Sequence, residues 1–421
     1  MTAVDMATAN AAEGLEVKKH NKAKEGAAIH EVEEEVKEEE ASLAAAGQQQ
    51  DRSPQERKKY HARVLKRYLD QIGENRDKTA ERKEHLFPMP AFVRTLCLPL
   101  LEDERDYIAL EMFLNLALTV PPLMALFWMY PSHIVGVIFL VWRLLTFAPR
   151  FMLTLHVTSH RRLFKQKYWP LNFMGTMLGF FLGLPPGFYY IHHVMMHHVE
   201  NNVFPYDVSS TMPHQRDTRW AMVHYISKYF THAVFYLPYY ALKKKKYGLF
   251  AFHAVCWVSY FIGGAYLYTL HPVATLWTIP IPFVVLGGAL MQGNFTQHVF
   301  VCPDDPFSNY RLTFNYVNHP DNQRTYNDGY HIDHHQNSRL HWSEVIQHFE
   351  DNIDKFADND AFVFKEIDTQ IVYRHVLNGT YKELYKYWVQ LTPDLTRSPE
   401  EFEALCRHRL KPIYKDNKKS C

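Results

Sequence analysis

The 47 residues from Leu249 to Phe295 contain no Asp, Glu, Lys or Arg. One transmembrane helix needs only about 20 apolar residues, so this stretch is long enough for two. His271 and Pro272 mark a turn near its middle. We therefore predict transmembrane helices over residues 249–270 and 273–294, joined by an uncharged loop.

An earlier apolar block, Met112 to Trp142, is too long for one span and short for two. Extending it in both directions predicts spans over 107–130 and 132–154. Arg143 then falls inside the second span, where we expect it to snorkel to the interface or to be buried against the protein.

Basic residues indicate how these spans are oriented. The loop "YPSH" between the first two spans has no Lys or Arg, whereas Arg150, Arg161, Arg162 and the run "KKKK" at 243–246 lie on the opposite side. Cytoplasmic loops are enriched in Lys and Arg. The pattern predicts four transmembrane helices in two hairpins, with both termini in the cytosol.

Two further apolar segments need a different explanation. Leu171 to Ile191 is apolar enough to resemble a fifth span, but a full crossing would separate histidine clusters that otherwise share one side, and Pro185-Pro186-Gly187 interrupts it. We predict an interfacial or re-entrant segment. The shorter "YFTHAVFYLPYYAL", residues 229–242, is interpreted in the same way, and a buried core helix remains an alternative for both.

The ends of the chain have other compositions. Residues 1–55 are rich in Ala, Glu, Lys and Gln and are predicted to be disordered. Residues 56–106 form a basic or amphipathic helical lead-in that begins with a helix capped by Ser53, with anionic lipid or solvent at its basic face. The N-terminus is neither a signal sequence nor a transit peptide.

Charge and cysteine content exclude several classes of protein. The formal net charge of +1 argues against a nucleic-acid partner. The five cysteines are scattered and form no CxxC pair, which argues against a disulfide framework and against a thiolate metal site.

The 25 histidines include three clusters. The first has His156 and His160, the second is "HHVMMHH" at 192–198, and the third is "HIDHH" at 331–335. Side chains three or four residues apart share a helix face, so each cluster directs two or three imidazoles one way. With four spans, all three clusters lie on the same side of the membrane and can surround metal.

Ligand type alone leaves the metal open, since imidazole binds zinc, copper, nickel and iron. Soluble di-iron bundles use Glu and Glu-x-x-His motifs, and no such repeated pair occurs here. Eight or more imidazole nitrogens could fill the coordination shells of two metals, whereas one zinc would need four.

The order of these motifs resembles the membrane-bound fatty acid desaturase and hydroxylase family over roughly residues 90–350. Two uncharged hairpins carry HxxxH after the first, HxxxHH before the second and HxxHH after it. In "NFTQHVF", Asn294 and His298 resemble the NxxxH motif that supplies a further ligand in this family. "NDGYHIDHH" followed by "LHW" resembles the third box of its acyl-chain desaturases.

The resemblance implies an all-α integral membrane protein. Four transmembrane helices in two hairpins and a cytosolic helical cap with a histidine-box di-iron site occupy residues 107–350, and 351–421 form a cytosolic C-terminal helical region. Two irons would activate dioxygen and abstract hydrogen from an unactivated methylene.

The two electrons would come from a separate donor, a b-type cytochrome or a ferredoxin with its reductase, because no HPGG haem signature occurs. The first box has three intervening residues, whereas many acyl-CoA desaturases have four, which favours an acyl-lipid substrate.

The resemblance also implies a set of site residues. The nine predicted metal ligands are His156, His160, His193, His197, His198, His298, His331, His334 and His335. Asn294 is expected to hold a metal-bound water, and Asp328 and Asp333 are expected to accept imidazole N–H bonds or to be plain surface carboxylates. His192 is ambiguous, because HHxxxHH has two registers. The histidines expected to be structural are His214, His224, His232, His253, His271, His319 and His341.

Three functions remain open from the sequence. The first is an oxygen-dependent acyl-lipid desaturase, the second a lipid or fatty acid hydroxylase or oxygenase of the same fold, and the third a non-catalytic membrane protein that binds metal or lipid. Lys418 and Lys419, fourth and third from the end, resemble a dilysine signal and predict residence in the endoplasmic reticulum.

Overall fold

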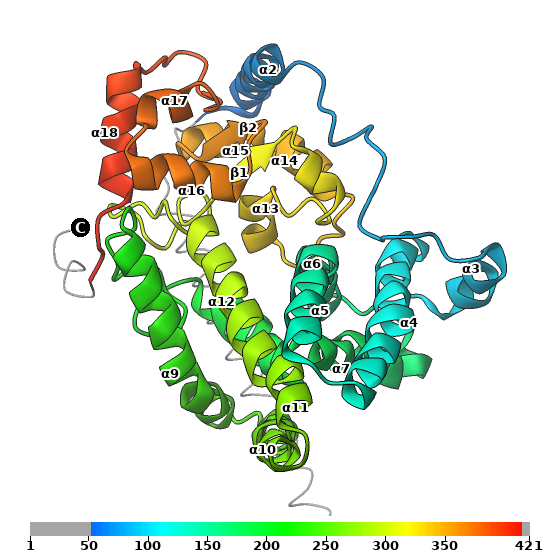
Figure 1. Ribbon diagram of the computed structural model, residues 1–421. Helices are drawn as coiled ribbons and strands as arrows, with labels where there is room; N and C mark the ends of the chain where they lie inside the picture. The colour runs from blue at the N-terminus through cyan, green and yellow to red at the C-terminus, as the bar shows by residue number, and fades with distance from the viewer. Residues whose placement is uncertain (1–51, 415–421) are drawn as a thin grey trace, which may run out of the picture. The chain divides into compact units, whose positions relative to one another are not determined.

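The computed structural model describes residues 52–414, and the described residues from Arg57 onward form one compact unit (Figure 1). The predicted disordered tail, up to residue 51, and Lys418 and Lys419 lie outside the described residues. The described chain is mostly helical, as predicted.

Three helical stretches are long and apolar enough to cross a membrane within the described residues. The first ends with α4 (Tyr107–Met129), the second is α10 (Tyr247–Leu270), and the third joins α11 (Pro272–Thr278) to α12 (Pro280–Gln297). These match three of the four predicted spans. Their outward side chains are apolar, including Leu118, Leu126, Val255 and Ile262.

The predicted span 132–154 was wrong in its shape. α5 (His133–Thr146) and α6 (Ala148–His160) meet at Phe147 with a bend of 52°. The pair therefore counts as a fourth span only if it is taken as one bent element. Pro149 lies in the first turn of α6. Because proline lacks an N–H and its ring clashes with the preceding turn, the straight helix breaks here.

The turns of the two hairpins lie together. The rings of Trp128, at the end of α4, and His271, between α10 and α11, are 5.6 Å apart. Trp277 Nε1 donates a hydrogen bond to His133 Nδ1 across 3.1 Å. Both uncharged turns therefore occupy the same end of the helices.

Two buried polar side chains bind carbonyl groups that helix breaks leave free. The guanidinium of Arg143 donates to Phe181 O at 2.7 Å and to Trp277 O at 2.9 Å, and Tyr260 Oη donates to Gly183 O at 3.0 Å. Non-helical backbone is tolerated at membrane depth only where the protein satisfies it. Burial against the protein, one of the two expected explanations, accounts for Arg143.

The segment 171–191 is not among the candidate spans. It is broken into η3 (Gln166–Phe173), α7 (Met174–Gly179) and η4 (Phe180–Leu182), and it turns at Gly183, whose φ is +94°. A Cβ at Gly183 would lie 2.6 Å from the backbone of Phe283, so both the conformation and the space require glycine.

The predicted half-span 229–242 is part of a longer helix, α9 (Arg219–Lys243), which packs against α10 and α12. Near its C-terminal end, Tyr240 Oη donates to Glu200 Oε1 at 2.6 Å, and Lys244 forms an ion pair with the same carboxylate at 3.1 Å. Because Glu200 follows the second histidine cluster, the lysine run begins on the same side as that cluster.

A polar cap gathers at one end of the long helices (Figure 1). Its elements are α2 (Pro54–Ile72), β1 (Phe314–Val317), η6 (Pro320–Gln323), α13 (His331–Gln336), α14 (Val345–Asp351), α15 (Ile353–Asp358), β2 (Phe362–Lys365), α16 (Thr369–Asn378), α17 (Tyr381–Tyr385) and α18 (Pro399–Arg409). The remaining short helices are α3 (Ala91–Cys97), η1 (Leu98–Leu100), η2 (Glu104–Asp106), η5 (Tyr190–His197) and α8 (His198–Glu200).

The parallel pair of β1 and β2 was not predicted, and it departs from an all-α fold. Both strands are short, and they are far apart in the sequence. The helix predicted from Ser53 is observed as α2, and Tyr60, Val64 and Tyr68 pack into the cap core. The apolar face of α2 therefore packs against the rest of the cap.

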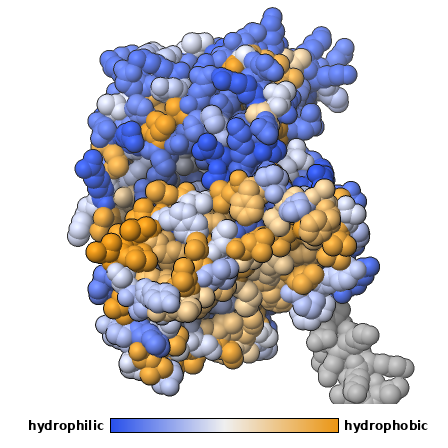
Figure 2. Space-filling view, turned by 45° about the vertical axis from the view of Figure 1, so that its right-hand side comes forward, coloured by the Kyte–Doolittle hydropathy of each residue, from blue (hydrophilic) through white to orange (hydrophobic). Residues whose placement is uncertain are grey.

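The surface of the protein also has an apolar part and a polar part. In Figure 2, hydrophobic residues cover a broad zone of the visible face, and hydrophilic residues cover the end above it. Exposed apolar patches of this kind mark contact with a membrane or a partner. The candidate spans supply many of the exposed apolar residues.

Candidate metal centre

The three histidine clusters come from three separate stretches of the chain. His156 and His160 lie in the last turns of α6, His193, His197 and His198 on η5 and the start of α8, and His331, His334 and His335 on α13. His298 follows α12 directly, and its N–H still bonds to Asn294 O at 3.1 Å. The bend at Phe147 directs the first cluster toward the other two.

The second cluster was expected on an α-helix, which is wrong. η5 is a π-helix, and in a π-helix hydrogen bonds join residues five apart. His193 and His198 consequently face each other, with their Nε2 atoms 3.1 Å apart. The ambiguous His192 packs against Tyr229, with ring centroids 4.8 Å apart, and lies outside both groups described next.

Eight of the nine predicted ligands form two groups whose ligand atoms lie within 4.8 Å of one another. The larger group contains His156, His160, His193, His198 and His334, and the smaller contains His197, His298 and His335. His331, the ninth, adjoins the smaller group, with its ring centroid 4.9 Å from His335 and 5.3 Å from His298. The seven histidines expected to be structural belong to neither group.

Hydrogen bonding alone does not account for these contacts. His334 Nε2 lies 2.7 Å from His156 Nε2 and 2.9 Å from His198 Nε2. One Nε2–H cannot donate along both directions at once, and facing lone pairs repel each other. The buried ring nitrogens His160 Nε2, His331 Nε2 and both of His335 have no hydrogen-bond partner. A shared cation would satisfy both observations.

Burial keeps the imidazoles in the form that binds metal. It lowers the pKa of His193, His198, His334, His335 and His298 well below the ordinary value, and the neighbouring histidines lower it further. These rings are therefore neutral near pH 7, with a lone pair available for a metal.

Hydrogen bonds at Nδ1 orient rings of the smaller group. His197 Nδ1 donates to Asp207 Oδ2 at 2.7 Å, and His298 Nδ1 donates to Leu312 O at 3.0 Å. A proton held at Nδ1 leaves Nε2 free, and such partners commonly orient metal ligands. The Nε2 atoms of His197 and His298 lie 3.2 Å apart.

Asp328 lies between the two groups. Its Oδ1 is 3.5 Å from His156 Nδ1 and 3.7 Å from His331 Nδ1, and Gln297 donates to its other oxygen at 2.6 Å. Burial alone would raise the pKa of Asp328, but the two histidines outweigh it and hold the pKa below the usual range. The carboxylate thus stays charged beside both rings.

Two predicted site residues have other partners. Asp333 accepts hydrogen bonds from His348 at 2.7 Å and from Asn315 at 2.8 Å, rather than from a predicted ligand. Asn294 donates to Tyr225 Oη at 2.7 Å. The ligand and water-holding roles assigned from the sequence stay predictions.

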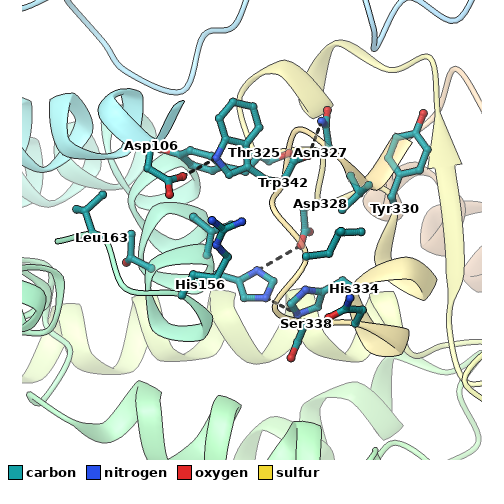
Figure 3. Close-up of a pocket in the computed structure, with 17 residues that line it drawn as sticks. Asp106, His156, Leu163, Thr325, Asn327, Asp328, Tyr330, His334, Ser338 and Trp342 are labelled. Carbon is teal, nitrogen blue, oxygen red and sulfur yellow. Dashed lines mark hydrogen bonds and ion pairs between the residues drawn. The ribbon is translucent and has the colours of Figure 1, made fainter. Parts of the chain in front are cut away.

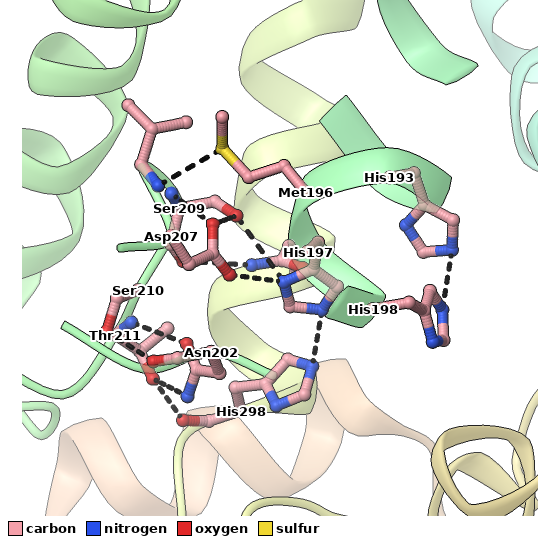
Figure 4. A network of polar contacts seen from close by, with 12 residues as sticks. His193, Met196, His197, His198, Asn202, Asp207, Ser209, Ser210, Thr211 and His298 are labelled. Carbon is pink, nitrogen blue, oxygen red and sulfur yellow. Dashed lines mark hydrogen bonds and ion pairs between the residues drawn. The ribbon is translucent and has the colours of Figure 1, made fainter. Parts of the chain in front are cut away.

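The polar network behind the smaller group was not predicted (Figure 4). Asp207 also accepts from the backbone and the hydroxyl of Ser209, at 2.7 and 2.6 Å. Thr211 Oγ1 donates to His298 O at 2.8 Å. No sequence signal distinguishes Asp207 or Thr211 from ordinary loop residues.

Arg216 connects this network to the C-terminal part of the chain. Its fully buried guanidinium donates to Val299 O, Arg409 O and Lys411 O, each at 2.8 Å. It has carbonyl acceptors around it, and burial lowers its pKa to about 9. Arg216 thereby links Val299, the residue after His298, to Arg409 at the end of α18.

A pocket borders the larger histidine group (Figure 3). His156 and His334 contribute to its lining, together with Arg161, Asp328 and Trp342. Trp342 Nε1 donates to Asp106 Oδ1 at 2.9 Å, which fixes the indole in the wall. The larger histidine group therefore borders a space that small molecules can enter.

The donor set fits a pair of transition-metal ions. Five nitrogens in one group and three in the other, with His331 beside them, suffice for two coordination shells, and all belong to imidazoles. Iron is compatible with such ligands, although imidazole also binds other metals.

Comparison with known proteins gives one match. A family model described as fatty acid desaturase matches residues 136–366, which is more than half of the chain and includes all nine predicted ligands. No curated protein and no solved structure matches the chain.

Proposed function

We propose, because this chain belongs to the fatty acid desaturase family, that it is a membrane di-iron oxidoreductase that introduces a double bond into the acyl chain of a lipid. The observation that carries the proposal is the convergence of eight imidazoles from four segments into two groups. Nine histidines would hold the two irons, five in the larger group and four in the smaller.

When bound, the irons would supply dioxygen activation and the two-electron oxidation of an unactivated carbon. The protein's residues hold the site in place. Asp207 and the carbonyl of Leu312 keep the protons of His197 and His298 on Nδ1, and Asp328 supplies negative charge beside His156 and His331. These contacts orient Nε2 atoms and offset the positive charge of bound metal.

Access to the site comes from two sides. The pocket beside His156 and His334 offers a route for dioxygen and water. Candidate spans such as α12 end beside the centre, which supports the entry of an acyl lipid from the hydrocarbon of the membrane. The short first box favours an acyl lipid over an acyl-CoA.

The proposed topology has four spans, both termini in the cytosol and residence in the endoplasmic reticulum. The contact between Lys244 and Glu200 supports a common side for the lysine run and the second cluster. No haem motif occurs in the sequence, so the electron donor is proposed to be a separate b-type cytochrome or ferredoxin system.

The test is the expression of the full chain in yeast, followed by mass spectrometry of total acyl lipids. The proposal predicts new acyl chains that have lost two hydrogens. Chains that have gained an oxygen would indicate a hydroxylase. An unchanged lipid profile from protein that holds iron, with a compatible donor present, would contradict the enzymatic proposal and favour a binding protein. A His334→Ala variant is the inactive control.

A further inference from the structure

A second set of unsatisfied polar atoms lies beside the candidate metal centre. Several buried side-chain atoms of the described residues have no hydrogen-bond partner, and five of them belong to four neighbouring residues: His192 Nε2, Tyr229 Oη, His253 Nδ1 and Nε2, and Trp257 Nε1. A comparable set occurs within the two histidine groups, where a bound metal would account for it. Metal binding does not account for the second set, because none of its residues belongs to either group.

These residues surround one aromatic ring. The ring centroid of Phe188 lies 5.9 Å from Tyr229, 6.2 Å from His253 and 5.6 Å from Trp257. The ring centroids of His192 and Tyr229 are 4.8 Å apart. We name Phe188, His192, Tyr229, His253 and Trp257 the Phe188 cluster.

Four residues of the cluster are buried, and Trp257 is half-buried with its Nε1 atom inaccessible to solvent. His253 is 0% exposed, Tyr229 2% and His192 3%. His253 and Trp257 are four residues apart on the candidate span α10, so they share one face of that helix. Buried polar groups in native proteins nearly always have partners, and each exception needs an explanation such as a bound molecule.

The cluster also adjoins the proposed catalytic centre. The ring centroid of His192 lies 6.3 Å from that of His197, a predicted ligand. At the other end, Trp257 packs against Phe261, with centroids 4.9 Å apart, further along α10. A lipid chain that lies along the cluster would therefore run from the membrane domain to the metal centre.

The hydrogen-bonding capacity of these atoms indicates which chemical group could bind to the cluster. Trp257 can only donate, Tyr229 can donate or accept, and a neutral His253 donates at one ring nitrogen and accepts at the other. A carbonyl could not satisfy an accepting nitrogen, and a charged group would be costly in this apolar setting. A hydroxyl group both donates and accepts, so it matches the set.

We propose that the Phe188 cluster binds a hydroxyl group on the hydrocarbon chain of a lipid, and that the substrates of this protein are hydroxylated long-chain lipids. The assignment of substrates rests on the proposed function, whereas the binding site does not. Selectivity arises because an unsubstituted chain leaves the buried donors and acceptors unpaired.

The first test measures binding without turnover. The purified full chain in detergent is incubated with equimolar stearoyl lysophosphatidylcholine and a series of hydroxystearoyl lysophosphatidylcholines that differ in hydroxyl position. Retained lipid is quantified by mass spectrometry. We expect a preference of about 10-fold for at least one hydroxyl position, because the hydroxyl satisfies two or more buried groups.

Trp257→Phe and His253→Phe should each reduce that preference by about 3-fold or more, because each removes a partner of the hydroxyl. Matched controls are Trp220→Phe and His232→Phe on α9, where Trp220 is 77% exposed and His232 is exposed. Both controls should keep the wild-type preference.

The second test measures stability without lipid. If the cluster binds a lipid hydroxyl, the indole N–H of Trp257 is buried without a partner in the lipid-free protein, and this burial lowers the stability of the fold. Trp257→Phe removes the unpaired N–H, so it should raise the melting temperature of the delipidated protein by about 2 °C. If water or an internal contact satisfies the cluster, the same change should lower it. A structural role thus predicts the opposite sign.

Equal retention of all chains, or a lower melting temperature for both Trp257→Phe and His253→Phe, would overturn the inference. Failure of the proposed function is distinguishable. A protein that desaturates plain acyl chains without preferring hydroxylated ones contradicts only the Phe188 cluster proposal. A protein that selects hydroxylated chains but forms no product contradicts only the enzymatic proposal.

Discussion

His197 and Asp207 form a buried hydrogen-bonded pair, with His197 Nδ1 and Asp207 Oδ2 2.7 Å apart and both side chains almost inaccessible to solvent. Burial alone would raise the pKa of Asp207, but the interaction with His197 outweighs burial and lowers the pKa. Asp207 is thus a carboxylate that accepts the Nδ1 proton, and Nε2 of His197 faces His298.

Replacing Asp207 should weaken metal binding in the smaller group. Asp207→Asn keeps the shape of the side chain but loses its charge, and losses of such partners typically reduce metal affinity about 10- to 100-fold. Iron titration of the apo protein measures this. Asp304→Asn, at an exposed carboxylate that pairs with His408, is the matched control and should leave the affinity unchanged. Equal affinities for the two variants would contradict the role of Asp207.

Arg216→Met tests the connection between the C-terminal region and the smaller group. The variant removes a buried charged donor from Val299 O, Arg409 O and Lys411 O, so the free energy of unfolding should fall by about 3 kcal/mol. Arg63→Met, which breaks an exposed ion pair with Asp394, should cost less than about 1 kcal/mol. Denaturant unfolding compares the two.

A milder variant separates positioning from stability. Arg216→Lys keeps the charge but cannot reach all three carbonyls, so we expect a folded protein whose iron spectrum differs from the wild type at one iron only. Mössbauer spectroscopy resolves the two sites. Identical spectra would restrict Arg216 to a stabilising role.

The metal-free protein should lose stability in acid. Burial lowers the folded-state pKa of several histidines, among them His193, His198 and His334, well below the ordinary value. The same side chains titrate near pH 6.5 when the chain unfolds. Below that pH the unfolded state binds more protons than the folded state. The free energy of unfolding is therefore highest above about pH 6.5 and falls progressively as the pH decreases.

Thermal unfolding of apo protein between neutral and mildly acidic pH measures this. The His193→Phe variant is the control, because it should show a smaller decrease with pH than the wild type. A melting temperature that is constant or rises toward acid would contradict the neutral state of the buried imidazoles.

The four-span topology predicts which loops glycosylation reaches. An acceptor site placed near His214 should stay unmodified, because that loop lies on the histidine side. An acceptor in a lengthened loop at His271 should be modified, since this turn contacts Trp128 at the opposite end of the helices. Gel mobility before and after glycosidase treatment reports the result. Modification near His214 would require an odd number of crossings between the first and second clusters.

Much of the fold was predictable because membrane spans depend on local composition. The uncharged stretch 249–295 forms most of α10 and α12 and all of α11, and three of the four predicted spans correspond to candidate spans of the structure. The bend at Phe147 was missed, although Pro149 is the signal that could have located it. The strands β1 and β2 are separated by 44 residues, and no local pattern specifies that they pair.

The site was partly predictable for the same reason. Imidazoles are easy to recognise, so the clusters were identified from spacing. The π-helix was not, because the interval of five between His193 and His198 has no meaning on an α-helix. Asp207 acts through His197, whose other ring nitrogen faces His298, and Arg216 acts through carbonyls such as Arg409 O. A single sequence does not reveal these contacts.

His298 distinguishes the two-metal site from a simple count of three clusters. It lies outside those clusters, yet its Nε2 is 3.2 Å from His197 Nε2 and it belongs to the smaller group. His298→Ala should leave that group with too few ligands, while His271→Ala, at the far turn, serves as the control. Melting temperatures of both variants check that they are folded.

The most direct measurement is therefore iron per chain in purified full-length protein, wild type and variants, by elemental analysis. We expect about two irons in the wild type and in His271→Ala, and about one in a folded His298→Ala. At most one metal ion in fully loaded wild-type protein, or about two irons retained by His298→Ala, would contradict the nine-histidine di-iron site.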